Sequence, residues 1–418
     1  MITSSIDIYS AGIAGVVVIG FIGDIIARKT GLPSIVWLLA FGIILGPVLG
    51  ILPASLLISL SPIVSTLVLL IIIFNAGLRL NIYQFVRSLS QTTILAVVNF
   101  VVSALLTAIA MYAFGFSQVD AILMGVIVGG TSAAVIPIIS KSAPMSSQSK
   151  NLVTVESILT DPIGIVLTLA IINIIILNNY SIGFVVSTVA ANFSIAIVFG
   201  ALAGIVWVPI MGYLQTNRYE YSYAGSIAAA FIIFILVQYI NGSGPIAALV
   251  FGIILANGET IYKEMKYENT KNFTLSKESK RFNSLVTFFT GAFFFVYLGG
   301  LVSFSNPYSF LIGVAITAAL IIARFIGTPV ALMKSQYNDD EKFQISYMVS
   351  RGMGAGVLAT LPLAYGIAGT GQFINIIFTV IILTILFNSI SSLYFSIKQK
   401  RIEAKIEQAQ QATVPHVQ

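Results

Sequence analysis

Charged side chains are too few in this chain to cover a water-soluble globule. Of its 418 residues, 9% are Asp, Glu, Lys or Arg and 57% are hydrophobic, whereas a soluble domain carries about 25% charged residues. Long apolar runs separate the charges, and a helix needs roughly 20 such residues to cross a bilayer. The composition therefore predicts an all-α polytopic membrane protein, because spanning helices satisfy their own backbone groups in lipid.

Thirteen apolar runs are candidate spans. Their approximate ranges are 9–27, 34–50, 61–78, 92–114, 120–140, 151–177, 182–213, 221–240, 243–257, 284–304, 307–333, 343–366 and 372–397. Of the 21 Lys and Arg residues, 19 follow odd-numbered spans and none follows an even-numbered one. The positive-inside rule then predicts a cell-membrane protein with an outer N-terminus and a cytoplasmic C-terminus. Residues 1–397 form the membrane domain, 257–283 a cytoplasmic loop, and 398–418 a polar cytoplasmic tail.

Several functional classes are excluded by residues that the chain lacks. It has no cysteine, and its single histidine, His416, lies near the C-terminus. Thiolate chemistry, cysteine-ligated metals and a buried imidazole are therefore excluded. An intramembrane aspartyl protease needs two facing aspartates, and Asp161 is the only one near the midplane. We expect no enzyme, no cofactor and no nucleic-acid partner, since topology explains the excess positive charge.

Two acidic residues, Glu156 and Asp161, lie inside the span predicted at 151–177. At ~1.5 Å per residue from the cytoplasmic boundary, Glu156 lies roughly 9 Å and Asp161 roughly 16 Å into a ~30 Å core. Asp161 is thus near the midplane. The helical turn points the two carboxylates about 140° apart, so Ser157 shares a face with Asp161 and Thr160 with Glu156. Ionisable groups at this depth indicate function or ion pairing.

Two basic residues, Arg324 and Arg351, also lie inside the predicted membrane region. Arg324 is expected roughly 15 Å from the cytoplasmic side, within reach of Glu156. Such a structural pair would leave Asp161 as the lone uncompensated carboxylate, whereas pairing with Asp161 would hold that group ionised. For Arg351, a gating or helix-capping role and snorkelling toward the surface are both open.

Two predicted spans are interrupted at corresponding positions. Residues 129–137 read Gly-Gly-Thr-Ser-Ala-Ala-Val-Ile-Pro, and 354–362 run from Gly354 to a proline at the same spacing. The glycines could serve close helix packing. The interrupted spans are the fifth and twelfth, and an odd offset of seven spans reverses the direction of crossing. The pattern therefore predicts inverted repeats over about 9–177 and 221–397, connected by the span at 182–213. Paired broken helices around a midplane site are typical of secondary transporters.

The run 156–162, Glu-Ser-Ile-Leu-Thr-Asp-Pro, resembles the sixth-span signature of the monovalent cation:proton antiporters. It is most similar to the thirteen-helix archaeal and bacterial sodium/proton antiporters of the NhaP type, as is Phe-Asn-Ala-Gly-Leu-Arg-Leu at 74–80. Arg324 and the Arg351-Gly352 stretch stand where that family has arginines. The resemblance implies a homodimer in the membrane lipid in which Asp161 binds both the cation and the proton.

The same resemblance implies the remaining site residues. Ser157, Thr131 and Glu156 would complete the cation site around Asp161, with Thr160 beside them, and Arg324 would pair with Glu156. Ser132, Arg351 and Gly354 are the expected gating or helix-break residues. The chain departs from the family pattern at three places: Thr160 replaces an Asn or Asp, Ser132-Ala133 replaces Asp-Pro, and Asn75 replaces an acid.

The mechanism predicted from these residues is competition at one site. Burial favours the neutral form of a carboxyl group, so Asp161 would carry either a proton or a monovalent cation (Na⁺, or Li⁺ or K⁺) as the site changes sides. One-for-one exchange is electroneutral and would serve pH homeostasis. Two alternatives are a sodium-coupled carrier of an organic solute, with Thr131, Ser132 and Asn75 lining a larger pocket, and a passive channel.

Overall fold

The computed structural model describes residues 5–80, 91–177, 182–217, 222–266, 273 and 275–412. Within these ranges every regular element is a helix, as the composition predicts. The helices are α1 (Ser5–Thr30), α2 (Ser34–Ile43) with the π-helical turn η1 (Ile44–Val48), α3 (Ala54–Arg79), α5 (Gln91–Ala113), α6 (Gln118–Ile127), α7 (Ile136–Ser142), α8 (Ser147–Leu177), α9 (Ile182–Thr216), α10 (Ser222–Tyr239), α11 (Gly244–Ala256), α12 (Gly258–Glu264), α13 (Lys277–Gly300), α14 (Pro307–Ala331), α15 (Asp339–Ser346), α16 (Met353–Ala364) and α17 (Gln372–Ala412).

The chain is a multi-pass membrane protein. Seven helices in the described ranges are long and apolar enough to cross a membrane, or eight if the bent pair α11 and α12 is one span. Each of the thirteen predicted ranges falls on a helix or on two consecutive helices. The count of thirteen crossings and the inverted repeats stay predictions.

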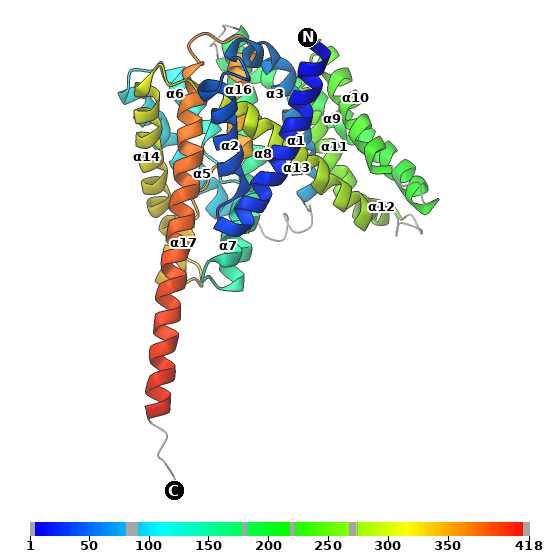
Figure 1. Ribbon diagram of the computed structural model, residues 1–418. Helices are drawn as coiled ribbons and strands as arrows, with labels where there is room; N and C mark the ends of the chain where they lie inside the picture. Colours follow the sequence, from blue (N-terminus) through cyan, green and yellow to red (C-terminus); the bar gives the residue numbers. More distant parts are fainter. Residues whose placement is uncertain are drawn as a thin grey trace.

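One predicted span boundary differs from the structure, and the described part of the predicted tail has a helical conformation. The ninth span was expected to end at 257, but the chain turns by 71° there and continues as α12. The expected loop 257–283 therefore begins as a helix, and its residues 267–272 and 274 lie outside the described part. The expected tail 398–418 is helical as far as Ala412, because α17 continues beyond the bundle (Figure 1), and residues 413–418 are likewise outside the described part.

Helix α8 lies at the centre of the bundle and positions the predicted site. It contacts α3, α5, α6, α7 and α16. On one side α14 packs between α5 and α17. On the other side α11 packs against α3, α9 and α10, and the two groups lie on opposite sides of the view in Figure 1. The second group has its own apolar core, which includes Phe74, Tyr223 and Phe251.

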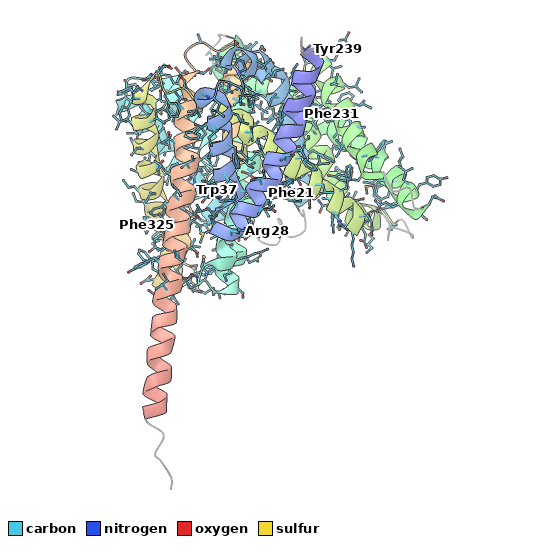
Figure 2. The ribbon with its side chains drawn as sticks, viewed as in Figure 1. Phe21, Arg28, Trp37, Phe231, Tyr239 and Phe325 are labelled. Carbon is cyan, nitrogen blue, oxygen red and sulfur yellow. The ribbon has the colours of Figure 1, made fainter. Side chains whose placement is uncertain are left out.

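The outer surface and the two ends of the bundle suit a membrane. Large apolar side chains such as Phe21 of α1 are exposed around it (Figure 2). Arg28 lies at the end of α1 opposite the N-terminus, where Nε of Arg28 is 2.9 Å from Oδ2 of Asp24. This basic end is also the end from which α17 projects in Figure 1.

Glycines bring α3 and α11 into backbone contact. A Cβ at Gly77 would overlap the carbonyl oxygen of Leu249, and a Cβ at Gly252 would overlap that of Phe74. Small residues allow this close approach of membrane helices. The side chain of Asn257, at the bend before α12, donates to the carbonyl oxygen of Leu80 at 2.8 Å. The C-terminal end of α3 is thereby held firmly against α11 and α12.

Candidate functional site

The two interrupted helices contact each other through their non-helical segments, 128–135 between α6 and α7 and 347–352 between α15 and α16. The backbone N–H of Ser132 donates to the carbonyl oxygen of Ser350 at 2.9 Å. A Cβ at Gly352 would overlap the side chain of Ser132. The glycines predicted to break these helices thus allow the two segments to cross at contact distance.

Arg351 holds the two broken ends together. Its Nε donates to the carbonyl oxygen of Val128 at 2.6 Å, at the end of α6, and its Nη1 donates to Val349, just after α15. The side chain is 1% exposed. Of the two roles that the sequence left open, these bonds fit helix capping, because a cation stabilises the carbonyl end of a helix. A side chain that snorkels would extend to the surface, whereas this one is buried.

Side chains of α17 complete the support of the second segment. Thr384 Oγ1 accepts from the Arg351 N–H at 3.1 Å, and Asn388 Oδ1 accepts from the Val349 N–H at 3.0 Å. Backbone groups freed by a broken helix need such partners in a water-poor interior. The sequence analysis did not identify these two residues, and their polar character on an apolar span was the available signal.

Glu156 of α8 and Arg324 of α14 form a buried ion pair in which both carboxylate oxygens accept from the guanidinium. Their side chains are 1% and 2% exposed. Asn99 of α5 also donates to Glu156 Oε1 at 3.2 Å. The structure thus has the first of the two pairings weighed for Arg324, and Asp161 is left without that counter-charge.

Asp161 lies between two small cavities. The inner cavity, of about 10 Å³, is lined by Ile127, Gly130, Thr131, Ser132, Thr160, Asp161, Gly164, Gly352, Gly354, Ala355 and Leu358. The middle cavity, of about 40 Å³, is lined by Ile72, Asn75, Ala76, Arg79, Ser132, Ala133, Ala134, Ile158, Asp161, Thr287, Met353 and Gly354. Asp161 is therefore partly exposed, unlike Glu156.

Neutral oxygens surround the inner cavity. Thr160 Oγ1 accepts from the Thr131 N–H at 3.2 Å, whereas the hydroxyl of Thr131 is buried with no hydrogen-bond partner. A Cβ at Gly354, in the first turn of α16, would lie 3.2 Å from Asp161 Oδ1. The positive N-terminal end of α16 therefore faces this carboxylate. One carboxylate and several neutral oxygens can hold a monovalent cation or a proton, and no cluster of three acidic or histidine side chains is found in the described residues.

Two of the predicted ligands do not line these cavities, and their role in cation binding stays a prediction. Ser157 and Glu156 line neither the inner nor the middle cavity. The Ser157 hydroxyl donates to the carbonyl oxygen of Thr154 at 2.8 Å, one turn back along α8, and the Glu156 carboxylate is occupied by Arg324. Helical periodicity predicts Ser157 on the same face as Asp161. Its hydroxyl donates its hydrogen to the preceding turn of α8 and keeps its oxygen lone pairs. The structure brings together Thr131, Thr160 and Asp161, with Ser132 and Gly354.

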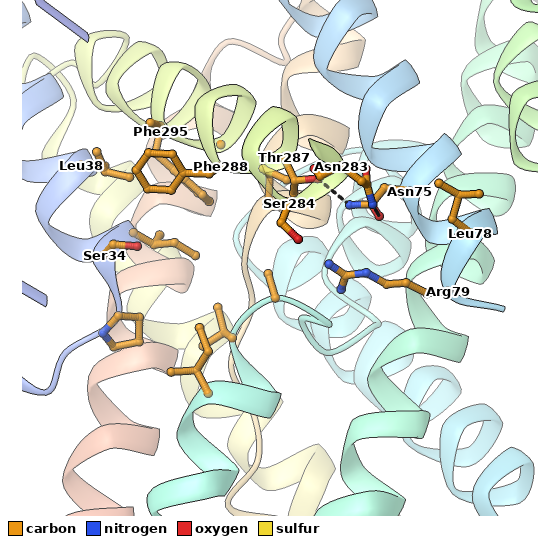
Figure 3. A pocket seen from close by; sticks show the side chains of 18 of the residues that line it. Ser34, Leu38, Asn75, Leu78, Arg79, Asn283, Ser284, Thr287, Phe288 and Phe295 are labelled. Atoms are coloured by element: carbon orange, nitrogen blue, oxygen red, sulfur yellow. Dashed lines mark hydrogen bonds between the residues drawn. The ribbon is translucent and has the colours of Figure 1, made fainter. Parts of the chain in front are cut away.

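An outer cavity of about 510 Å³ adjoins the middle cavity and is shown in Figure 3. The two cavities share Asn75, Arg79, Ala134, Thr287 and Met353. The outer cavity lies at the basic end of the bundle, because Ser34 at the start of α2 and Lys280 near the start of α13 line it. The route from the outer cavity to Asp161 thus passes Arg79 and its neighbours.

A polar network occupies the wall of the outer cavity. Asn75 donates to Thr287 Oγ1 at 2.8 Å, as the dashed line in Figure 3 marks, and accepts from Asn283 Nδ2 at 2.9 Å. Asn283 also accepts from the Tyr223 hydroxyl at 2.6 Å. From the sequence, Asn75 was noted as a replaced acid and as a pocket residue of the organic-carrier alternative, whereas its partners on α13 could not be foreseen.

Helices that cross at two interrupted segments beside a partly exposed aspartate define a membrane transporter of the broken-helix type. A family model described as "Sodium/hydrogen exchanger, transmembrane" matches residues 14–393. The chain belongs to this family of monovalent cation:proton antiporters.

Similar proteins fit this assignment. The chain is 24% identical over 369 residues to the K⁺/H⁺ antiporter NhaP2 of Shewanella baltica, a match covering 86% of this chain and 61% of that protein. It therefore spans about three-fifths of that relative. It is 24% identical over 319 residues to a probable Na⁺/H⁺ antiporter of Methanocaldococcus jannaschii, covering 73% and 72% of the two chains.

The fold is similar to that of a solved antiporter. The structure of the sodium proton antiporter MjNhaP1 from Methanocaldococcus jannaschii at pH 8 matches with a TM-score of 0.77 and 21% identity. The match covers 92% of this chain and 100% of that one.

Proposed function

We propose that the protein exchanges a monovalent cation, Na⁺ in the first instance, for H⁺ by alternating access, with the two ions competing for Asp161. The observation that carries this proposal is the unpaired Asp161 carboxylate between the inner and middle cavities, while Glu156 is neutralised by Arg324. A site with one carboxylate carries one positive charge in either direction. Exchange is therefore electroneutral.

The size of the site favours an ion over an organic solute. The inner cavity of about 10 Å³ has room for about one water molecule, and the middle cavity of about 40 Å³ for a few. Thr131 and Ser132 line the inner cavity, whereas Asn75 lines the middle and outer cavities. The three residues of the organic-carrier alternative do not share one pocket.

The proposal includes an orientation and an assembly. The basic end of the bundle, with the outer cavity, faces the cytoplasm, so the conformation is open toward the inside with the N-terminus outside the cell membrane. The protein works as a homodimer and contributes to pH homeostasis. Asp161, Thr131 and Thr160 hold the cation or proton, and Ser132, Gly354 and Arg351 form the crossing that moves with them.

The first test follows pH in proteoliposomes with a preset proton gradient. Addition of Na⁺, Li⁺ or K⁺ is expected to move protons within seconds for at least one ion, and the response is expected to persist when potassium and valinomycin hold the voltage at zero. Proton movement only under an applied voltage would contradict electroneutral exchange. Silence for every ion would contradict the proposed function, and passive ion flux without proton movement would identify a channel.

Thr131→Val tests whether the unpartnered hydroxyl binds the cation. We expect the apparent KM for the cation to rise about three- to tenfold, the effect of losing one oxygen ligand, with the melting temperature unchanged. Thr168→Val is the matched control, since Thr168 of α8 is another buried hydroxyl without a partner but lines neither cavity at Asp161. Equal KM values for wild type and Thr131→Val would remove Thr131 from the site.

A further inference from the structure

Arg79 lies between the Asp161 carboxylate and the outer cavity. It is the last residue of α3, and it lines both the middle cavity, with Asp161, and the outer cavity. In Figure 3 its guanidinium projects into the space below Asn75 and Thr287. The sequence analysis counted Arg79 only among the basic residues that set the topology.

The guanidinium connects the end of α3 to the interrupted segment between α6 and α7. Its Nη1 donates to the carbonyl oxygen of Ala133, in the interrupted segment after α6, at 3.2 Å. At its own end, α3 is held to α11 by the close contact at Gly77 and by the bond from Asn257 to Leu80. The side chain is nevertheless exposed, so one hydrogen bond on an open side chain can break without unfolding its surroundings.

Arg79 and Asp161 line the same middle cavity, so the positive charge of the guanidinium acts on the carboxylate across it. Within the described part of the chain, the other ionisable groups near this part of the molecule are Arg351, the pair Glu156 and Arg324, and Lys280. Arg351 is bound to two broken helix ends. Glu156 and Arg324 neutralise each other, and Lys280 lines the outer cavity but not the middle one. Thr131 and Ser132, from the segment after α6, and Thr287 of α13 contribute no charge. Among the described residues, Arg79 is thus the exposed basic side chain that lines a cavity together with Asp161.

We infer that Arg79 sets the affinity of the site for the transported ion. Its guanidinium is a tethered cation that competes with this ion for the negative charge of Asp161, on the side where the outer cavity opens. A positive charge at this position disfavours both the arriving cation and the proton. It thereby keeps the affinity of Asp161 low enough for the bound ion to be released toward that side. The inference rests on the proposed function and adds the residue that sets its affinity.

The test is ion exchange in everted membrane vesicles, whose outer surface is the proposed cytoplasmic face. For Arg79→Gln we expect the apparent KM for the cation to fall about five- to tenfold, as for removal of a nearby unit charge in a partly hydrated site. The proton affinity rises with it, so the pH of half-maximal activity is expected to move upward by about 0.7 to 1 unit. Vmax is expected to fall, because the ion is released more slowly.

Two variants separate charge from tethering. Arg79→Lys keeps the charge and loses the forked guanidinium, and its KM and pH profile are expected to stay near wild type. Lys280→Gln removes a charge from the outer cavity alone and is expected to change the KM less than twofold. If Lys280→Gln and Arg79→Gln act equally, the general field of the cavity sets affinity and the inference is wrong.

A chemical version does not depend on how Arg79→Gln folds. The chain has no cysteine, so Arg79→Cys presents a single thiol in already folded protein. A cationic trimethylammonium-ethyl thiosulfonate is expected to return the KM to the wild-type value, and neutral methyl thiosulfonate to leave it low. Identical responses to the two reagents would overturn the inference. If wild type exchanges ions but the charge at position 79 has no effect, the inference about Arg79 is wrong and the proposed function stands. If wild type does not exchange ions, the proposed function is wrong as well.

Discussion

Asp161→Asn is expected to abolish cation-driven proton movement, by at least a hundredfold, while the protein stays folded. An amide has nearly the shape of the carboxyl group but can neither release a proton nor compensate a cation. The site would then carry the same neutral group in both directions, so the two ion gradients would no longer be coupled. The measurement is the pH response of proteoliposomes to the preferred cation, with the melting temperature of the same preparation.

Asp24→Asn is the matched control for this replacement. Asp24 is an aspartate in an exposed ion pair with Arg28 at the end of α1, where surface pairs contribute roughly 0 to 1 kcal/mol. Its exchange activity is expected to equal that of wild type. Robust, voltage-independent exchange by Asp161→Asn would show that another group carries the proton, and the single-site mechanism would fail.

Features that depend on local composition could be predicted from the sequence. The helical membrane fold follows from the scarcity of charge, and the two interruptions follow from glycines and prolines within apolar runs. The pairing of Glu156 with Arg324 follows from their similar depth in the membrane, because the rise per residue is a fixed property of helices. Each of these inferences needs only one segment, or two segments measured from a common boundary.

Features that depend on how distant helices meet could not be predicted in the same way. Helical rotation predicts the face of α8 on which Ser157 lies, but it does not give the partner of its hydroxyl, which donates to the carbonyl oxygen of Thr154. Arg79 was interpreted from its place in the charge pattern, because nothing local shows that α3 ends opposite Ala133. The sequence likewise could not show that Thr384 and Asn388 of α17 face the second broken segment.

The second large effect is expected on stability, at the buried pair of Glu156 and Arg324. Glu156→Gln leaves the guanidinium in the interior without its counter-charge, and breaking a buried pair in this way costs about 3–5 kcal/mol. Arg324→Gln leaves the carboxylate unpaired and is expected to cost a similar amount. The measurement is the melting temperature of each purified variant. Its readout is the loss of the monomeric or dimeric peak on size-exclusion chromatography after heating.

The double variant Glu156→Gln with Arg324→Gln distinguishes a structural pair from a cation ligand. Two neutral amides can bond to each other, so the double variant is expected to be more stable than either single variant. If Glu156 only neutralises Arg324, the double variant exchanges ions with a KM close to wild type, because Asp161 and Thr131 are untouched. A KM raised tenfold or more in a well-folded double variant would instead make Glu156 a ligand of the transported cation, the role that the family resemblance implied and that its ion pair with Arg324 argues against.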